Sequence, residues 1–172
     1  MNQVHRHAAD RPPGWRAEVS TPSPCYEWTG FGATPGALGT GADRPGAVCR
    51  ETSGAGCSLH TGPDRWLVAA PSPATVESLQ MAQRQGVGAA IEVTGKWRRL
   101  RLIALPASAG QAHPLSAALP IELMLADREC ASLWAFDCPV IVVRGEVELE
   151  LWVEASYEAG LLAMLATLGV AT

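Results

Sequence analysis

A pattern of short apolar strand, serine and amphipathic helix occurs twice in this sequence of 172 residues. The first copy is WLVAAPSPATVESL (residues 66–79) and the second is LWVEASYEAGLLAML (residues 151–165). Each helix has one apolar side that must be covered, and the strand beside it belongs to a layer that can cover it. The repeat therefore predicts an α+β fold with two layers, in which helices cover one face of an antiparallel sheet.

The first copy carries clear start and stop signals. A turn, Gly62-Pro63-Asp64, precedes a strand predicted over residues 65–70. Ser72 can cap a helix that has proline at its first position, and Gly86 stands just beyond the end, so we predict a helix over residues 73–85. Two strands joined by a Thr-Gly-Lys turn are predicted for residues 89–95 and 98–106, and a helical stretch interrupted by proline is predicted for residues 108–119.

The second copy follows a predicted hairpin. PVIVV (residues 139–143) and EVELELWVE (residues 146–154) flank Arg144-Gly145, as in two antiparallel strands. Leu149, Leu151 and Val153 alternate with Glu148, Glu150, Trp152 and Glu154, so one face of this strand is expected to be solvated. Ser156 can cap a final helix before Gly169, with an apolar stripe made by Leu161, Leu162, Leu165 and Leu168.

The first third of the chain has a different composition. Residues 1–56 are rich in Gly, Pro, Ser and Thr without a sustained period, which indicates an extended arm in front of a domain of residues 57–172. Solvated tails are poor in aromatic residues, yet this arm contains Trp15, Trp28 and Phe31. We therefore expect a partner to cover its aromatic side chains.

Charge and composition exclude several classes of protein. A net charge of -4 does not suit a protein that binds nucleic acid, which needs a basic face. The sequence contains no apolar run of about 20 residues and no secretory signal, so we expect a cytoplasmic location. Its 5 cysteines show no Cys-x-x-Cys spacing, which argues against a zinc ribbon or a disulfide framework and favours reduced thiols.

Several segments resemble one known family. GPDRWLVAAP (residues 62–71) resembles the GPDEWLL..AP element of the gamma subunit of heterotetrameric sarcosine oxidase. Three further segments are similar to that family in the same order, namely IEVTGKWRRLRLIAL (91–105), LPIELM (119–124) and the run from 129 to 165. The similarity extends over about residues 57–168. Glu92 stands where the family has aspartate, and Pro114 interrupts the family's second helix.

The resemblance implies a fold like the folate-binding domain of the glycine-cleavage T-protein. It also implies an accessory, non-catalytic subunit of a hetero-oligomer that oxidises sarcosine or a related N-methyl amino acid. FAD, FMN, NAD and tetrahydrofolate are then expected on larger partner subunits, with none bound by this chain. Two other readings stay open: a free-standing folate-binding module that acts as a homodimer, and an unrelated interaction domain.

No catalytic, cofactor-binding or metal-binding residue is predicted. The Gly-rich run GATPGALGTGAD (residues 32–43) lacks the Lys-Ser/Thr of a phosphate loop and the strand-to-helix context of a dinucleotide loop. His5 and His7 have no third ligand, and His60 and His113 have no identifiable nucleophile partner. We interpret His60 and His113 as structural.

The segment KWRRLR (residues 96–101) is the sharpest polar feature. Lys96, Arg98, Arg99 and Arg101 surround Trp97, and alternation places Arg99 and Arg101 on one strand face. Such a face cannot enter a core without paired acids, so it faces solvent, a partner or an anion such as a folate tail or flavin phosphate. We favour a partner interface that includes Trp28, Phe31, Trp97, Arg98, Arg99 and Arg101.

Overall fold

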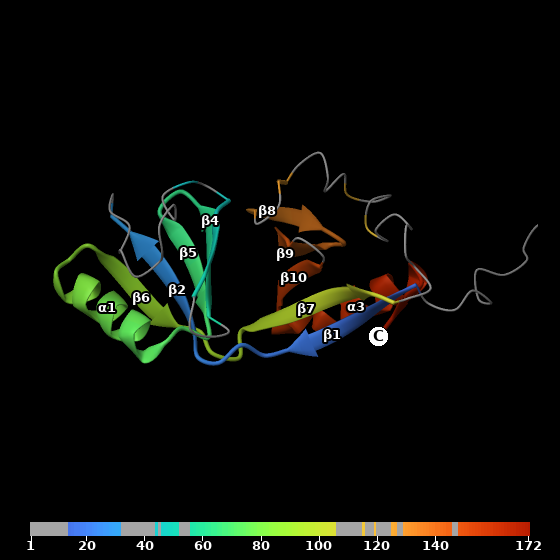
Figure 1. The fold of residues 1–172 in the computed structure, drawn as a ribbon, viewed down its shortest axis with the longest axis horizontal. Helices are drawn as coiled ribbons and strands as arrows, with labels where there is room; N and C mark the ends of the chain where they lie inside the picture. Colours follow the sequence, from blue (N-terminus) through green and yellow to red (C-terminus); the bar gives the residue numbers. More distant parts are fainter. Residues whose placement is uncertain are drawn as a thin grey trace, which may run out of the picture.

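Two β-sheets pack face to face at the centre of the molecule (Figure 1). The computed structural model describes residues 14–31, 44, 46–51, 56–105, 115, 119, 125–126, 129–145 and 148–172. The six-stranded sheet has the order β11 (Val170–Ala171), β1 (Trp15–Ser20), β7 (Trp97–Ala104), β10 (Leu149–Glu154), β9 (Cys138–Arg144) and β8 (Glu129–Ala135). The five-stranded sheet has the order β3 (Val48–Arg50), β4 (Cys57–Gly62), β5 (Arg65–Ala69), β2 (Cys25–Gly30) and β6 (Gly88–Glu92). Neighbouring strands are antiparallel except β1 and β11, which are parallel.

A helix covers the outer face of each sheet. Helix α1 (Pro73–Arg84) packs Leu79 and Ala82 against the five-stranded sheet, and α3 (Glu158–Thr167) packs Leu161 and Leu165 against the six-stranded sheet. The layers therefore run helix, sheet, sheet, helix. The α+β class is confirmed. The prediction of two layers is wrong, because two helix-sheet units pack together through the sheet faces that their helices leave free.

Several strands are apolar on both faces, which explains why the fold has four layers instead of two. In β5, Trp66 and Val68 pack under α1, whereas Leu67 and Ala69 belong to the core between the sheets. The expected solvated face of residues 146–154 is wrong at its centre. There Glu150 and Trp152 face the other sheet and are 0 % and 1 % exposed.

The two strand-helix copies occupy matching places in the two sheets. In each sheet, three consecutive strands form a meander, the last of them leads into the helix, and the strand after the helix lies at the opposite edge of the sheet. The meander is β3-β4-β5 before α1 and β6 in one sheet, and β8-β9-β10 before α3 and β11 in the other. The sequence repeat therefore corresponds to a repeat of topology.

The described residues before position 57 are part of this framework. β1 pairs with β7 in one sheet, and β2 pairs with β5 and β6 in the other. The expectation of a separate arm over residues 1–56 is corrected for these strands. They were missed because each is only 6 residues long and lies among Gly, Pro and Ser residues that mask a period of two.

The caps and turns have mixed outcomes. Ser72 Oγ accepts a hydrogen bond of 3.2 Å from the Thr75 amide, as predicted for the start of α1. Ser156 does not cap α3, because it lies in the 3-10 turn η4 (Ala155–Tyr157) before the helix. Apart from Leu115 and Leu119, the helix predicted over residues 108–119 lies outside the described residues. Among the described residues, neither helix combines the length and apolarity needed to cross a bilayer.

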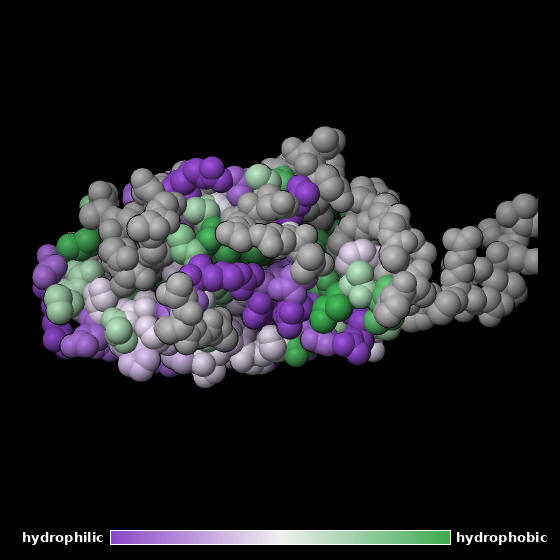
Figure 2. Space-filling view, viewed as in Figure 1, coloured by the Kyte–Doolittle hydropathy of each residue, from purple (hydrophilic) through white to green (hydrophobic). Residues whose placement is uncertain are grey.

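Hydrophilic side chains gather near the middle of the face drawn in Figure 2, in the region where the two sheets meet, with smaller apolar areas on either side. The polar part of this face therefore lies at the boundary between the sheets. At this boundary, polar side chains of both sheets form an ion cluster and line a cleft.

Trp28 and Phe31 offer a matched test of which aromatic residues the fold needs. Trp28 is 1 % exposed and packs so closely that a Cβ on Gly88 would lie 2.3 Å from its Cζ2 atom, whereas Phe31 is 68 % exposed. We predict that Trp28→Ala lowers the free energy of unfolding by about 3–5 kcal/mol, because it opens a cavity. Phe31→Ala should change it by less than about 0.5 kcal/mol.

Urea denaturation followed by circular dichroism measures both values. Equal, small effects of the two substitutions would contradict the burial of Trp28 by its own chain.

Candidate functional site

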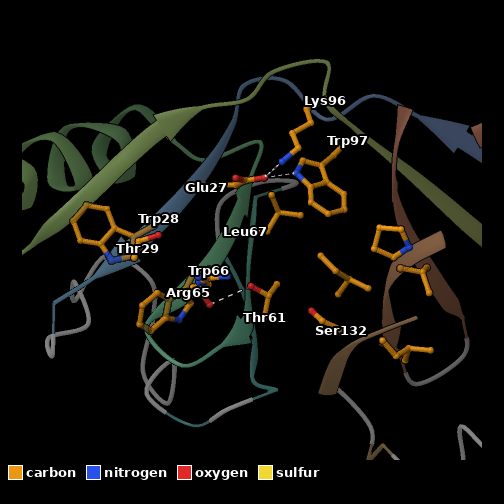
Figure 3. Close-up of a pocket in the computed structure, with 14 residues that line it drawn as sticks. Glu27, Trp28, Thr29, Thr61, Arg65, Trp66, Leu67, Lys96, Trp97 and Ser132 are labelled. Atoms are coloured by element: carbon orange, nitrogen blue, oxygen red, sulfur yellow. Dashed lines mark hydrogen bonds and ion pairs between the residues drawn. The ribbon is translucent and has the colours of Figure 1, made fainter. Parts of the chain in front are cut away.

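A cleft of ≈ 390 Å³ lies between the two sheets (Figure 3). Strands β2, β4 and β5 supply one wall, β8 and β9 the other, and the turn before β7 closes one end. The lining residues are Glu27, Trp28, Thr29, Thr61, Arg65, Trp66, Leu67, Lys96, Trp97, Ser132, Leu133, Pro139, Val140 and Ile141.

The cleft lies where the apolar contact between the sheets ends. Leu67 and Ile141 are members of the core between the sheets and also line the cleft, so they mark its floor. Arg65 lies two residues before Leu67 in β5, so both side chains are on the same face of the strand. Arg65 pairs with Thr29 of the neighbouring strand β2. Arg65 and Thr29 cannot continue the apolar packing of Leu67 and Ile141, so the space between the sheets is not filled beside them.

A carboxylate, an ammonium group and an indole meet at one end of the cleft (Figure 3). Lys96 Nζ lies 2.7 Å from Glu27 Oε1, and Trp97 Nε1 donates to the same oxygen at 3.0 Å. Lys96 also lies 3.5 Å from a carboxylate oxygen of Glu154. The hydrogen bond to Glu27 raises the pKa of Lys96 above its ordinary value, so the lysine is charged at neutral pH.

The other end of the cleft carries hydroxyl groups and a guanidinium. Thr61 Oγ1 donates to the backbone oxygen of Arg65 at 3.3 Å, and within the described part of the chain the arginine side chain forms no ion pair. Arg65 is exposed, as are Thr29 and Ser132. Figure 3 shows Ser132 across the cleft from Thr61, on the strand that forms the edge of the six-stranded sheet.

A buried carboxylate joins the two sheets outside the cleft. Glu150 on β10 accepts two hydrogen bonds from Arg99 on the neighbouring β7, at 2.9 and 2.6 Å. Arg50, which lies on β3 of the other sheet, donates to Glu150 at 2.5 Å, and Trp152 Nε1 donates at 3.1 Å. The Glu150 side chain is 1 % exposed and thus depends on these donors for its stability as an anion.

The donors around Glu150 keep it ionised. Burial by itself raises the pKa of Glu150, but the hydrogen bonds and positive charges of Arg99 and then Arg50 outweigh it, so the pKa lies below its ordinary value. Burial likewise lowers the pKa of Arg99, and Glu150 more than restores it. Each charge is therefore stable in this site only because the other is present.

The three predicted interface arginines all have acidic partners within the chain. Arg99 binds Glu150, Arg98 Nε donates to Glu158 Oε2 at 3.0 Å, and Arg101 Nε donates to Glu148 Oε2 at 3.0 Å. The sequence argument found no paired acids, because they lie some 50 residues later, in β10, just before it and at the start of α3. Strand pairing and tertiary packing bring them to the arginines. These arginines have a structural role whatever else they contact.

The three predicted interface aromatics are placed differently from one another. The chain itself buries Trp28, so nothing of this side chain is left for a partner to cover. Trp97 is half-buried and lines the cleft, where it donates to Glu27. Phe31 is exposed directly after β2 and remains available for an interface.

The described cysteines and His60 have structural surroundings. None of the 5 cysteines forms a disulfide, and 4 of them are buried, including Cys130 and Cys138, which lie on β8 and β9. His60 stacks on Trp66 with ring centroids 4.5 Å apart. His5, His7, His113 and the Gly-rich run 32–43 lie outside the described residues. Within the described part of the chain, no three His, Cys, Asp or Glu side chains gather as metal ligands.

Sequence reasoning missed Glu27, Arg65 and Glu150. Arg65 stood inside the turn and strand that were recognised, but nothing in the sequence showed that its side of β5 faces a second sheet. Glu150 lay in a recognised alternation and was assigned to solvent, although acids opposite an arginine-rich strand would have been a usable signal. Glu27 lay in the segment interpreted as an arm.

Comparison with known proteins supports the fold. No family model matches the chain, and no curated protein matches it by sequence. Among solved structures, the chain is similar to a chain of heterotetrameric sarcosine oxidase from Corynebacterium sp. U-96, in a complex with pyrrole 2-carboxylate. The TM-score is 0.67 with 22% sequence identity, and the match covers 92% of this chain and 85% of that chain. The chain therefore has the fold of a sarcosine oxidase chain.

Glu150→Gln tests the ion cluster between the sheets. The substitution leaves Arg99 and Arg50 without a counter-charge, so the free energy of unfolding should fall by about 3–5 kcal/mol near neutral pH. Glu77→Gln, on the exposed side of α1, is the control and should change it by less than about 0.5 kcal/mol.

The pH dependence of this difference has a definite sign. The pKa of Glu150 is lowered in the folded state, so its stabilisation is fully present above the ordinary value of 4.5 and is lost as pH falls towards the folded pKa. Urea titrations should show a constant gap between wild type and Glu150→Gln above about pH 5 and a shrinking gap below it. A gap that widens in acid would contradict the ion cluster.

The cysteines should behave as core residues towards an alkylating reagent. Burial raises the pKa of Cys25 and Cys130 to about 12 and that of Cys57 to about 11, and the thiolate is the reactive form. In the native chain, iodoacetamide should label only the half-buried Cys49 readily, and in denaturant it should label every cysteine. Mass spectrometry reads out the sites, and fast native labelling of Cys57 would refute the core role.

Proposed function

We propose that this chain is an accessory subunit of a sarcosine-oxidase-like complex. The observation that carries the proposal is the match to a chain of heterotetrameric sarcosine oxidase over 92% of this chain and 85% of the other. Each chain covers most of the other, so the likeness extends over the whole of the fold that they share. The substrate of the complex would be sarcosine or a related N-methyl amino acid, and its place would be the cytoplasm.

The role we propose for the chain is non-catalytic. FAD, FMN, NAD and tetrahydrofolate would bind to larger partner subunits, and electron transfer would occur there. The charge clusters described here suit a structural component, because Glu150, Arg99 and their neighbours neutralise one another and connect the two sheets. The family's T-protein-like fold and its link to one-carbon metabolism belong to the same proposal.

Exposed aromatic residues offer the contact surface. Trp134 on β8 is 70% exposed and Phe31 after β2 is 68% exposed. Tryptophan and arginine dominate the energy of protein interfaces, and large exposed aromatic side chains are disfavoured in free proteins. We propose that a partner covers Phe31 and Trp134, with Trp97, Arg98, Arg99 and Arg101 contributing at the edge of the contact through their exposed parts.

Co-expression of the tagged chain with the larger flavin-containing chains from its own source tests assembly. The wild-type chain should retain those chains and their flavin absorbance on an affinity column. Phe31→Ala and Trp134→Ala together should reduce the retained flavin at least about tenfold, since interface aromatics of this kind contribute roughly 2 kcal/mol or more.

Thermal melting of the isolated variant is the control and should match wild type, because both side chains are exposed. A chain that retains no flavin-bearing partner, elutes as a dimer and binds a reduced folate would replace this proposal with the free-standing folate module. Unchanged retention by the double variant would place the interface elsewhere on the surface.

A further inference from the structure

Arg65 is the charged group of the cleft that has no counter-charge. The other two charged side chains in the lining, Glu27 and Lys96, neutralise each other at 2.7 Å. Among the described residues, no acidic side chain forms an ion pair with Arg65, and its neighbour Thr61 contacts only its backbone oxygen. Lys96 faces Glu27 and, outside the lining, Glu154 at 3.5 Å, so the positive charge at the other end of the cleft comes from Arg65.

The surroundings of Arg65 combine hydroxyl donors with an apolar floor. Thr29 lies opposite Arg65 in the sheet, and Ser132 lies on the facing wall. Both hydroxyl groups are exposed. The rest of the lining is largely apolar and comes from both sheets, with Leu67, Leu133, Pro139, Ile141 and the indole of Trp97 as its main members.

We propose that this cleft binds a small organic carboxylate with a flat apolar body. The carboxylate pairs with the guanidinium of Arg65, which presents paired donors in the geometry that a carboxylate matches. The body lies between the two sheets, against Leu67 and Ile141 on the floor and Trp97 at the end. The volume of ≈ 390 Å³ falls within the range of small-molecule sites, which are mostly apolar with a few placed polar groups.

The charged groups of the cleft disfavour a cationic ligand and a neutral ligand. Glu27, the acid in the lining, already accepts from Lys96 and Trp97, so a cationic ligand would have to displace one of these donors. A neutral ligand would gain the apolar contacts but would leave Arg65 without a partner. The lining comes from this chain, so binding of a carboxylate can be measured on the chain without any other subunit.

The test is a titration of the isotopically labelled full-length chain with naphthoate, followed by the NMR signal of the Trp97 indole NH. Naphthyl methanol, which has the same ring but no charge, is the ligand control. Arg65→Gln removes the charge at the site, and Arg84→Gln removes one charge from the exposed last turn of α1, outside the lining. Ser132→Trp fills the cleft from the edge strand and serves as a second, independent variant.

Naphthoate should bind the wild-type chain saturably and shift the Trp97 signal. Its affinity should fall roughly tenfold in Arg65→Gln and stay unchanged in Arg84→Gln, because a charge-assisted pair is lost only in the first. Naphthyl methanol should bind more weakly and equally to wild type and Arg65→Gln. Ser132→Trp should abolish both. Non-saturable shifts, or equal naphthoate affinity in wild type and Arg65→Gln, would overturn the proposal.

Discussion

A single buried carboxylate determines how the two sheets of this molecule meet. Glu150 belongs to one sheet, and it receives hydrogen bonds from Arg99 of the same sheet and Arg50 of the other. A buried ion pair adds little to stability when compared with a well-packed apolar pair, but either charge left alone is costly. The relative position of the sheets that satisfies all three residues is therefore strongly favoured, and shifted arrangements leave a charge unpaired.

The cleft is the other consequence of this packing. Next to the ion cluster, Trp152, Ile141 and Leu67 close the space between the sheets with apolar contact. Beyond them, Thr29, Thr61 and Arg65 come from one sheet and Ser132 from the other, and these side chains cannot fill an apolar core. The ion cluster fixes the sheets at one place, and the polar side chains at another place leave a cleft between them. Its wall contains the guanidinium of Arg65, which has no ion-pair partner among the residues that the structure describes.

The sequence predicted the elements well and their partners poorly. Ser72, Gly86 and the alternation around residues 139–154 correctly placed α1 and the β9-β10 hairpin, because caps and local periods act within a few residues. Glu150 was assigned to solvent because alternation separates two faces without showing what covers each. The partners of Arg98, Arg99 and Arg101 depend on strand register and tertiary packing, and the cleft needs two sheets whose contact no local pattern encodes.

Nearly the whole sequence has the fold of a sarcosine oxidase chain. On this basis we propose that the chain belongs to a complex of that kind. Native mass spectrometry of the endogenous protein, purified without a tag, tests that claim most directly. The account predicts a single assembly in which the chain of 18.1 kDa is bound to larger chains that release flavin on dissociation. A spectrum that contains only the free chain or its homodimer would contradict it.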